Sequence, residues 1–489
     1  MLADLLSLEN SKKKKWLFFA SFLFVILLGI GIYFEFYYIM LLPMALVVFW
    51  AAFYKLQYLI LLVAFCTPFS LSLEGTDLGG VGVYLPTEPV LFGILILFVF
   101  KALSGKSIDS KIYAHPISML LYAYLAWMML TSITSEIPLV SFKFLINKLW
   151  FIIPLFFIGA HVFRDEKKVR LFLMCYLFPL FGVIIYTIVR HSQYGFDKDS
   201  SHWVMEPLFK DHTSYGAVLA MFMPVLAGLL LKKKMNLLLR VLLALGFLIL
   251  LTGLILSYTR AAWLSVIVAI GVLGFMLLRI KLSTIYITLI ASSTIIAVSW
   301  DDLSVMLQKN KQESSDKLQE HVSSISNVSS DASNLERLNR WHCAFEMFKE
   351  RPLIGWGPGT YQFVYAPFQR STDRTIISTN QGDGGNAHSE YLGPLCEQGL
   401  LGMIIMITLV LMVTKLAFKL FYRTIDYDTK LLIASIYLGL LTYFVHGVLN
   451  NYLDTDKASV PFWGFIAALV AIDLYYEPKS IDPALQQRL

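Results

Sequence analysis

His388 is the residue of this sequence best suited to acid–base chemistry. It lies in the segment 386–392, which reads NAHSEYL. An imidazole with an ordinary pKa of about 6.5 exchanges protons near neutral pH, so His388 is a candidate general base. Glu390 and Tyr391 are candidate substrate contacts, although Glu390, two residues on, would not share a helical face with His388. The alternative is a loop histidine that is hydrogen-bonded to backbone.

Arg260 is the second candidate. It stands in the stretch 257–263 (SYTRAAW), between two long apolar runs with almost no loop to hold it. An arginine at such a membrane edge is costly unless it snorkels, pairs or meets an anion. Its guanidinium fork matches phosphate geometry, so Arg260 is a candidate diphosphate ligand. The alternative is interfacial snorkelling beside Trp263.

Arg337 and Arg340 are further candidates for diphosphate binding. They are three residues apart on an amphipathic helix predicted over 335–350, so they point to similar faces. The alternative is a solvated charged edge. Lys148 and His212, each next to a predicted span on the same side of the membrane, are candidate substrate contacts. The alternative for the segment around His212 is a helix N-cap, with Thr213 or Ser214 as the capping residue.

Metal ligation is not expected. No His-Glu-x-x-His or Cys-x-x-Cys spacing occurs, and the nine histidines are scattered. Asp454-Thr455-Asp456 resembles an Asp-x-Asp metal motif, but three residues in a short loop are a weak signal. The sequence therefore predicts neither a metal nor another cofactor. Cys343 and Cys396 either pair in an oxidising compartment or remain free thiols.

The elements that must position these residues are membrane spans. The 489 residues are 57% hydrophobic and only 15% charged, against about 25% charged in soluble domains. Apolar runs long enough to cross a bilayer recur along the chain. We expect an all-α polytopic membrane protein with about 12–14 transmembrane helices. The predicted spans are 16–34, 36–53, 56–72, 87–104, 116–134, 149–163, 171–190, 215–231, 237–257, 261–278, 282–299, 398–421, 431–452 and 459–476.

Lysine and arginine in the short loops give the orientation. If fourteen spans alternate, the basic loops all fall on one side, which the positive-inside rule assigns to the cytoplasm together with both termini. The net charge of +6 is thus a topology signal and not a nucleic-acid footprint. The run Lys12–Lys15 precedes a long apolar segment without a cleavage site, so the first span is expected to be retained.

The expected organisation is transmembrane helices over 1–300, a large external loop over 301–397, three more spans over 398–478 and a cytoplasmic tail over 479–489. Within the loop, 308–334 is polar and expected to be flexible or loosely helical. The residues 355–359 (GWGPG) predict a tight turn, and a second short helix is expected to start near Ala387.

These pieces resemble the O-antigen ligase and polymerase superfamily of bacterial envelope enzymes. The resemblance rests on the stretch around Arg260, on the run from Glu336 to Tyr361, and on NAHSEYL followed by 397–402 (EQGLLG). It covers about 250–402. It implies a GT-C-like, metal-independent glycosyltransferase that uses His388 with Arg260 and Arg337, and Arg340 as the nearest rival of Arg337.

The resemblance also implies the substrates and the place of reaction. The donor is a glycan on undecaprenyl diphosphate at the periplasmic face of the bacterial inner membrane, in contact with membrane lipids. Ligases transfer it to lipid A-core, polymerases to another lipid-linked repeat unit, and related enzymes to Ser or Thr of proteins. We favour the ligase. A transporter or flippase is a distant alternative, because such proteins carry charges near the bilayer midplane and often inverted repeats.

Overall fold

A computed structural model of the chain describes residues 19, 21–26, 28–30, 56–72, 83–105, 108–284, 287, 291, 332–370 and 385–476. The chain divides into two compact units, Met1–Leu59 and Ile60–Leu489. All candidate site residues belong to the second unit. The predicted span 36–53, the polar segment 308–331 and the tail 479–489 lie outside the described residues. The predicted span 16–34 lies only partly inside them, and the predicted span 282–299 lies mostly outside.

Within the described part of the chain, nine helices are long and apolar enough to cross a membrane. They confirm the predicted all-helical, multi-pass architecture. They are α7 (Pro116–Ile133), α8 (Pro138–Ile152) continued by the π-helical η3 (Ile153–Ile158) and α9 (Gly159–Val162), α10 (Glu166–Ser192), α11 (His212–Leu230), α12 (Leu237–Leu256), α13 (Arg260–Leu277), α19 (Leu392–Arg423), α20 (Tyr427–His446) and α21 (Asp456–Tyr475).

Shorter elements complete the described chain. A small antiparallel pair joins Leu71 to Leu85 and Ser72 to Tyr84. The predicted spans 56–72 and 87–104 correspond to shorter apolar helices, α4 with η2, and α5. The shorter elements are α4 (Leu56–Cys66), η2 (Thr67–Phe69), β1 (Leu71–Ser72), β2 (Tyr84–Leu85), α5 (Thr87–Leu103), α6 (Ser110–Tyr113), η4 (Ser200–His202), α17 (Ala332–Glu350), α18 (Tyr361–Val364) and η5 (Ala366–Phe368).

Three predicted helix starts were wrong. The sixth span begins at Pro138, not at residue 149, because proline suits the first helical turn. Lys148 therefore lies inside a spanning helix and not before it. The helix expected from Ala387 begins at Leu392 and is continuous with the twelfth span. The cap of α11 is Asp211, whose carboxylate accepts from the backbone N–H groups of Thr213 and Ser214.

The core of the bundle runs along α11, α20 and α21, which are mostly buried, whereas α12 and α13 expose much of their apolar surface. Glycine allows the close approach of α11 and α20, since a Cβ at Gly439 would lie 2.5 Å from the Met221 carbonyl oxygen. The exposed leucines of α12 suit contact with lipid. This packing leaves the polar segments at the helix ends free to form a site.

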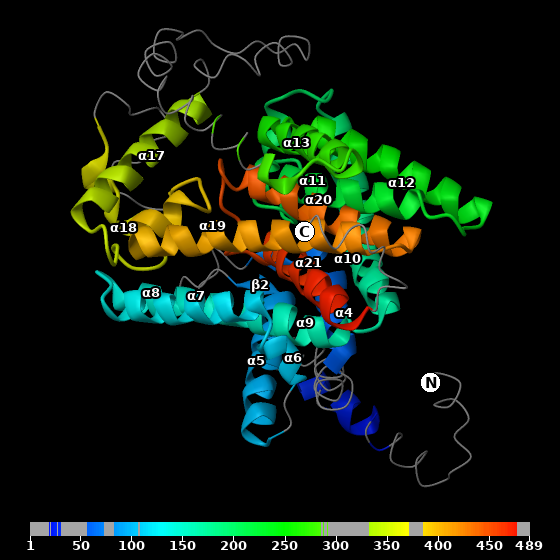
Figure 1. Cartoon of the computed structure of the whole chain (residues 1–489), viewed down its shortest axis with the longest axis horizontal. Helices are drawn as coiled ribbons and strands as arrows, with labels where there is room; N and C mark the ends of the chain where they lie inside the picture. Colours follow the sequence, from blue (N-terminus) through cyan, green and yellow to red (C-terminus); the bar gives the residue numbers. More distant parts are fainter. Residues whose placement is uncertain are drawn as a thin grey trace. The chain divides into compact units, whose positions relative to one another are not determined.

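The described residues between α13 and α19 have a small core of their own. Residues of α17 pack with the start of α19 and with α18, and Figure 1 shows this group beside the start of α8. Cys343 and Cys396 both lie in this core as free thiols. The cluster consists of Cys343, Ala344, Met347, Tyr361, Tyr365, Ala387 and Cys396. α17 and segment 386–392 are therefore held as one packed body.

Candidate active site

A break in α19 joins the 355–359 turn to the membrane bundle. The backbone of Gly399 is non-helical, with φ 71°. The carbonyl groups freed by the break accept from the predicted turn: Trp356 N–H donates to Cys396 O at 3.0 Å and Gly357 N–H to Glu397 O at 2.7 Å. Leu400 N–H donates in return to Pro352 O at 2.9 Å. These hydrogen bonds fix the backbone position of Glu397.

Glycine is required on both sides of this joint. Gly355 and Gly399 have φ of +67° and +71°, a region that only glycine occupies without cost. A Cβ at Gly355 would lie 2.3 Å from the Glu397 carbonyl carbon, and one at Gly399 would lie 2.2 Å from the Leu353 oxygen. The glycines of the two motifs therefore let two backbones touch.

His388 is held by its backbone in an unusual conformation. Its φ is +47°, which costs free energy for a side chain with a Cβ and is commonly found at functional sites. The His388 N–H donates to Asn386 Oδ1 at 3.0 Å, and Trp341 Nε1–H donates to the His388 carbonyl at 3.5 Å. The imidazole position is thus set by the NAHSEYL segment and by α17 together.

The surroundings of His388 favour the neutral imidazole. Burial, together with the nearby Arg337 and Arg340 cations, lowers its pKa from 6.5 to about 4, against the weaker opposing effect of Glu336 and Asp211. At neutral pH the ring is therefore able to accept a proton. The structure brings His388 together with two of the three predicted arginines.

The two arginines of α17 have different environments. Arg340 is buried: its Nε donates to Glu336 Oε1 at 2.6 Å, and its guanidinium lies 4.0 Å from the centre of the Tyr365 ring. A Cβ at Gly385 would overlap it. Arg337 is half-buried, and its Nε donates to Leu449 O at 3.3 Å. The contacts of Arg340 therefore indicate a role in holding the fold, whereas Arg337 lies nearer to solvent.

Arg260 begins α13 beside the start of α11. The preceding Thr259 donates from Oγ1 to the His212 carbonyl at 2.8 Å. The His212 ring stacks on His202, with 4.2 Å between ring centres. Asp211, next to His212, is one of the charges that act on His388. Arg260 and His212 thus belong to the same end of the bundle as His388, as the sequence predicted.

Glu390 and Tyr391 join the segment to the loop that follows α20. Glu390 Oε1 accepts from Tyr443 Oη at 2.6 Å, from Tyr452 N–H at 2.8 Å and from Leu453 N–H at 2.9 Å. Burial raises the Glu390 pKa, an effect that the Lys148 cation opposes. Tyr391 Oη donates to the Phe444 carbonyl at 2.9 Å.

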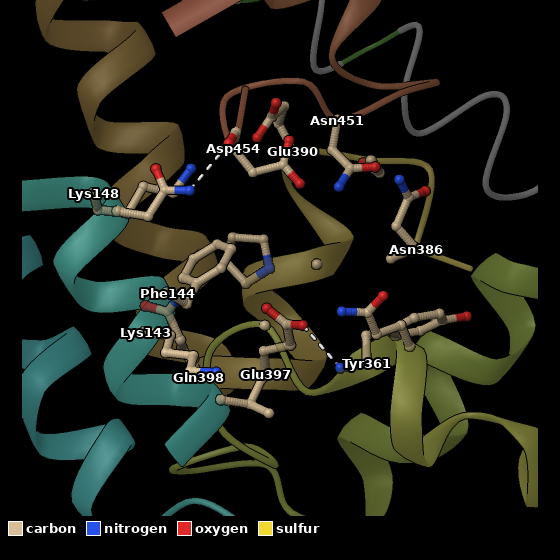
Figure 2. A pocket seen from close by; sticks show the side chains of 18 of the residues that line it. Lys143, Phe144, Lys148, Tyr361, Asn386, Glu390, Glu397, Gln398, Asn451 and Asp454 are labelled. Atoms are coloured by element: carbon tan, nitrogen blue, oxygen red, sulfur yellow. Dashed lines mark hydrogen bonds between the residues drawn. The ribbon is translucent and has the colours of Figure 1, made fainter. Parts of the chain in front are cut away.

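A cavity of about 510 Å³ lies beside the NAHSEYL segment. Figure 2 shows its wall, where Lys148 of α8 and Glu397 of α19 face the interior. Lys148 Nζ donates to the Leu453 carbonyl at 2.5 Å, and Tyr361 N–H donates to Glu397 Oε1 at 3.0 Å. Ala387, Ser389 and Glu390 line the cavity, whereas His388 and the predicted arginines are not among its lining residues.

Sequence reasoning assigned no role to Glu397, Asn147 or Asn451, which line this cavity. Glu397 is the first residue of the EQGLLG motif, and its position two residues before Gly399 could have marked it as a candidate. The two asparagines come from segments far apart in the chain and carried no signal. Asp456, part of the weak metal motif, instead accepts from Ser70 Oγ at 2.5 Å and from Thr87.

Among the described residues, no three His, Cys, Asp or Glu side chains are grouped so that they could hold a metal ion. Metal independence stays a prediction.

The comparisons with known proteins agree with this geometry. Residues 244–407 match the family described as O-antigen ligase, and no curated protein matches the chain. The match spans Arg260, α17, the broken helix and His388, and it confirms the resemblance carried by the motifs over about 250–402. The chain therefore carries an O-antigen ligase family domain over residues 244–407 and is a membrane-embedded, lipid-linked glycan transferase of the GT-C-like type.

Proposed function

We propose that the chain is an O-antigen ligase, which transfers a glycan from undecaprenyl diphosphate to lipid A-core at the periplasmic face of the bacterial inner membrane. The observation that carries the chemistry is His388, held as a neutral imidazole beside Arg337 and Arg340. A neutral base next to fixed cations suits a reaction in which an alcohol is deprotonated while a diphosphate leaves.

The proposed step balances as a direct displacement. The acceptor hydroxyl loses its proton to His388 Nδ1 or Nε2 while its oxygen bonds to the anomeric carbon. The bond from that carbon to the diphosphate oxygen breaks, and the electron pair leaves with the lipid diphosphate. Arg260 and Arg337 stabilise the charge that develops there, and Arg340 adds its positive charge from within its ion pair. Attack opposite the leaving group inverts the anomeric centre.

The base assignment is tested with His388→Ala and His388→Gln in a purified transfer assay. A positioned general base contributes about 10²–10⁴ in rate, so both variants should lose at least about a hundredfold in kcat. His342→Ala is the matched control, because His342 lies on α17 and pairs with Glu346. Near-normal transfer by the His388 variants, with intact folding, would exclude the base role.

The acceptor is tested by the glycan profile of a deletion strain. Loss of a ligase leaves lipid A-core uncapped while long lipid-linked glycan accumulates. Core that carries single repeat units would instead identify a polymerase. Normal lipopolysaccharide together with unglycosylated proteins would identify a protein O-glycosyltransferase, and unchanged glycans would argue against transfer of any of these kinds.

A further inference from the structure

Unsatisfied polar atoms gather around the cavity between α8 and α19. Asn147 Oδ1, Gln398 Oε1 and Asn451 Oδ1 are buried acceptors without a hydrogen-bond partner, and Trp150 Nε1 is a buried donor without one. All four residues line the cavity. Buried polar groups are normally satisfied, and leaving one unpaired costs about 1–3 kcal/mol. A wall with several such groups is prepared for a ligand that brings its own hydrogen bonds.

The orphaned atoms define the chemistry of that ligand. Three amide oxygens require donors, and the carboxylate of Glu397 adds a further acceptor in the same wall, held by the N–H of Tyr361. Aromatic side chains of Phe144 and Tyr361 line the same space, as Figure 2 shows. Many hydroxyl donors combined with apolar C–H faces describe a sugar, and a cavity of about 510 Å³ has room for one or two sugar rings.

We propose that this cavity binds the acceptor glycan and determines which glycan is accepted, with Asn147, Asn451 and Glu397 as its sugar-binding residues. The proposal rests on the proposed transfer function and specifies the substrate of the same site. Glu397 and Gln398 lie within the family match at 244–407, whereas Phe144, Asn147 and Asn451 lie outside it. The family domain thus supplies one part of the cavity lining, and segments outside the match supply the part that distinguishes sugars.

The position of the cavity favours the acceptor over the donor. Ala387 and Ser389, the two neighbours of His388, line the cavity, so a sugar bound there lies next to the residue proposed to take the acceptor's proton. In an inverting displacement, the attacking oxygen and the leaving diphosphate lie on opposite faces of the anomeric carbon. With the diphosphate beside the arginines, the acceptor sugar enters from the cavity.

The mouth of the cavity carries positive charge. Lys143 and Lys210 are exposed and line it, while Lys148 lies deeper and is bonded to Leu453. Exposed cations at a mouth attract an anionic ligand, so an acceptor sugar that bears phosphate or carboxylate is favoured over a neutral one.

The test measures acceptor binding apart from catalysis. The probe is core oligosaccharide, released by mild acid from purified lipopolysaccharide and titrated by calorimetry into the full-length His388→Ala protein in detergent. Adding Asn147→Ala and Asn451→Ala should raise the Kd about tenfold or more, since each lost hydrogen bond weakens binding several-fold. Asn450→Ala is the matched control, because Asn450 is buried beside Asn451, bonds to His446 and does not line the cavity.

Steady-state kinetics of the Asn147→Ala and Asn451→Ala enzymes with intact His388 separate the two substrates. We expect a raised KM for the core acceptor and an unchanged KM for the lipid-linked donor. A raised donor KM with unchanged acceptor binding would overturn the acceptor assignment, and unchanged Kd and KM would overturn the cavity proposal. Core binding by the protein with intact His388, together with no transfer to core, would refute the ligase function and leave the sugar site standing.

Discussion

His388 combines two features that the chemistry of a general base requires. Its backbone is held in the left-handed region, and burial with two neighbouring cations keeps its imidazole neutral. A pKa of about 4 makes the free enzyme's base weaker than one poised near neutral pH. Binding of an anionic diphosphate beside Arg337 would offset that cation and raise the His388 pKa, so the base gains strength when the donor is present.

The pH profile tests this coupling. The acid limb of kcat/KM reports the free enzyme and should fall near pH 4, whereas the acid limb of kcat reports the donor complex and should lie at higher pH. Arg337→Gln removes a cation that disfavours protonation of His388. The acid limb of kcat/KM should therefore move to higher pH, but stay below pH 6.5 because burial is the larger cause of the lowered pKa.

Lys349→Gln is the control for the pH profile. Lys349 is on the same helix as Arg337, is exposed and pairs with Glu346. The substitution removes the same charge at a distance from His388, so the acid limb should not move. An equal shift in both variants, or no shift in Arg337→Gln, would contradict the electrostatic role of Arg337.

The role of Arg260 is tested by a substitution that keeps the positive charge and removes the planar guanidinium group. Arg260→Lys retains a cation that snorkels equally well but cannot offer two parallel N–H donors to a diphosphate. We expect kcat to fall about tenfold or more, with normal expression and thermal stability in detergent. Full activity in the lysine variant would reduce Arg260 to a membrane anchor.

At the residue scale, the sequence predicted the groups whose chemistry is local. His388 and Arg337 were predicted from residue type and motif. The pairing of Arg340 with Glu336 follows from the i,i+4 spacing of a helix. The contact of Arg340 with Tyr365, and the cavity position of Asn451, depend on contacts between distant segments. No local spacing encodes such contacts.

The broken helix α19 is the element that couples the membrane bundle to the external segment. Gly399→Ala places a Cβ 2.2 Å from the Leu353 oxygen in a backbone conformation that strains side chains. The strain amounts to about 1–3 kcal/mol before the clash is added. We expect a lower midpoint of thermal unfolding and lost transfer, because the turn at 355–359 positions Glu397.

Gly271→Ala in the spanning helix α13 is the control, since a Cβ there would meet nothing within 4 Å and Gly271 does not line the cavity. It should leave stability and transfer unchanged. Normal stability in Gly399→Ala would show that the joint is not needed.

The sequence predicted which helices exist better than it predicted where they start. Pro138 and Asp211 set helix starts through N-terminal and capping preferences, which the apolar pattern used to predict the spans does not reveal.

At the scale of the whole molecule, two sets of loops gather at opposite ends of the bundle. Thr259 bonds to His212, and Tyr452 bonds to Glu390, so the loops predicted to be external meet around the site. The basic loops meet elsewhere: Arg170 and Lys233 both bond to Asp428. The alternation predicted from lysine and arginine thus agrees with which loops touch. It could be predicted because charge asymmetry between loops survives errors in span boundaries.

Which end faces the cytoplasm stays a prediction, and single-cysteine labelling tests it. In a variant with the four native cysteines replaced by alanine, Gln193→Cys marks the end with the site and Lys234→Cys marks the basic end, since both positions are exposed. A membrane-impermeant maleimide should label Gln193→Cys in spheroplasts and Lys234→Cys only after permeabilisation. The reverse pattern would place His388 in the cytoplasm, where a periplasmic acceptor is out of reach, and would exclude the ligase while leaving the membrane transferase intact.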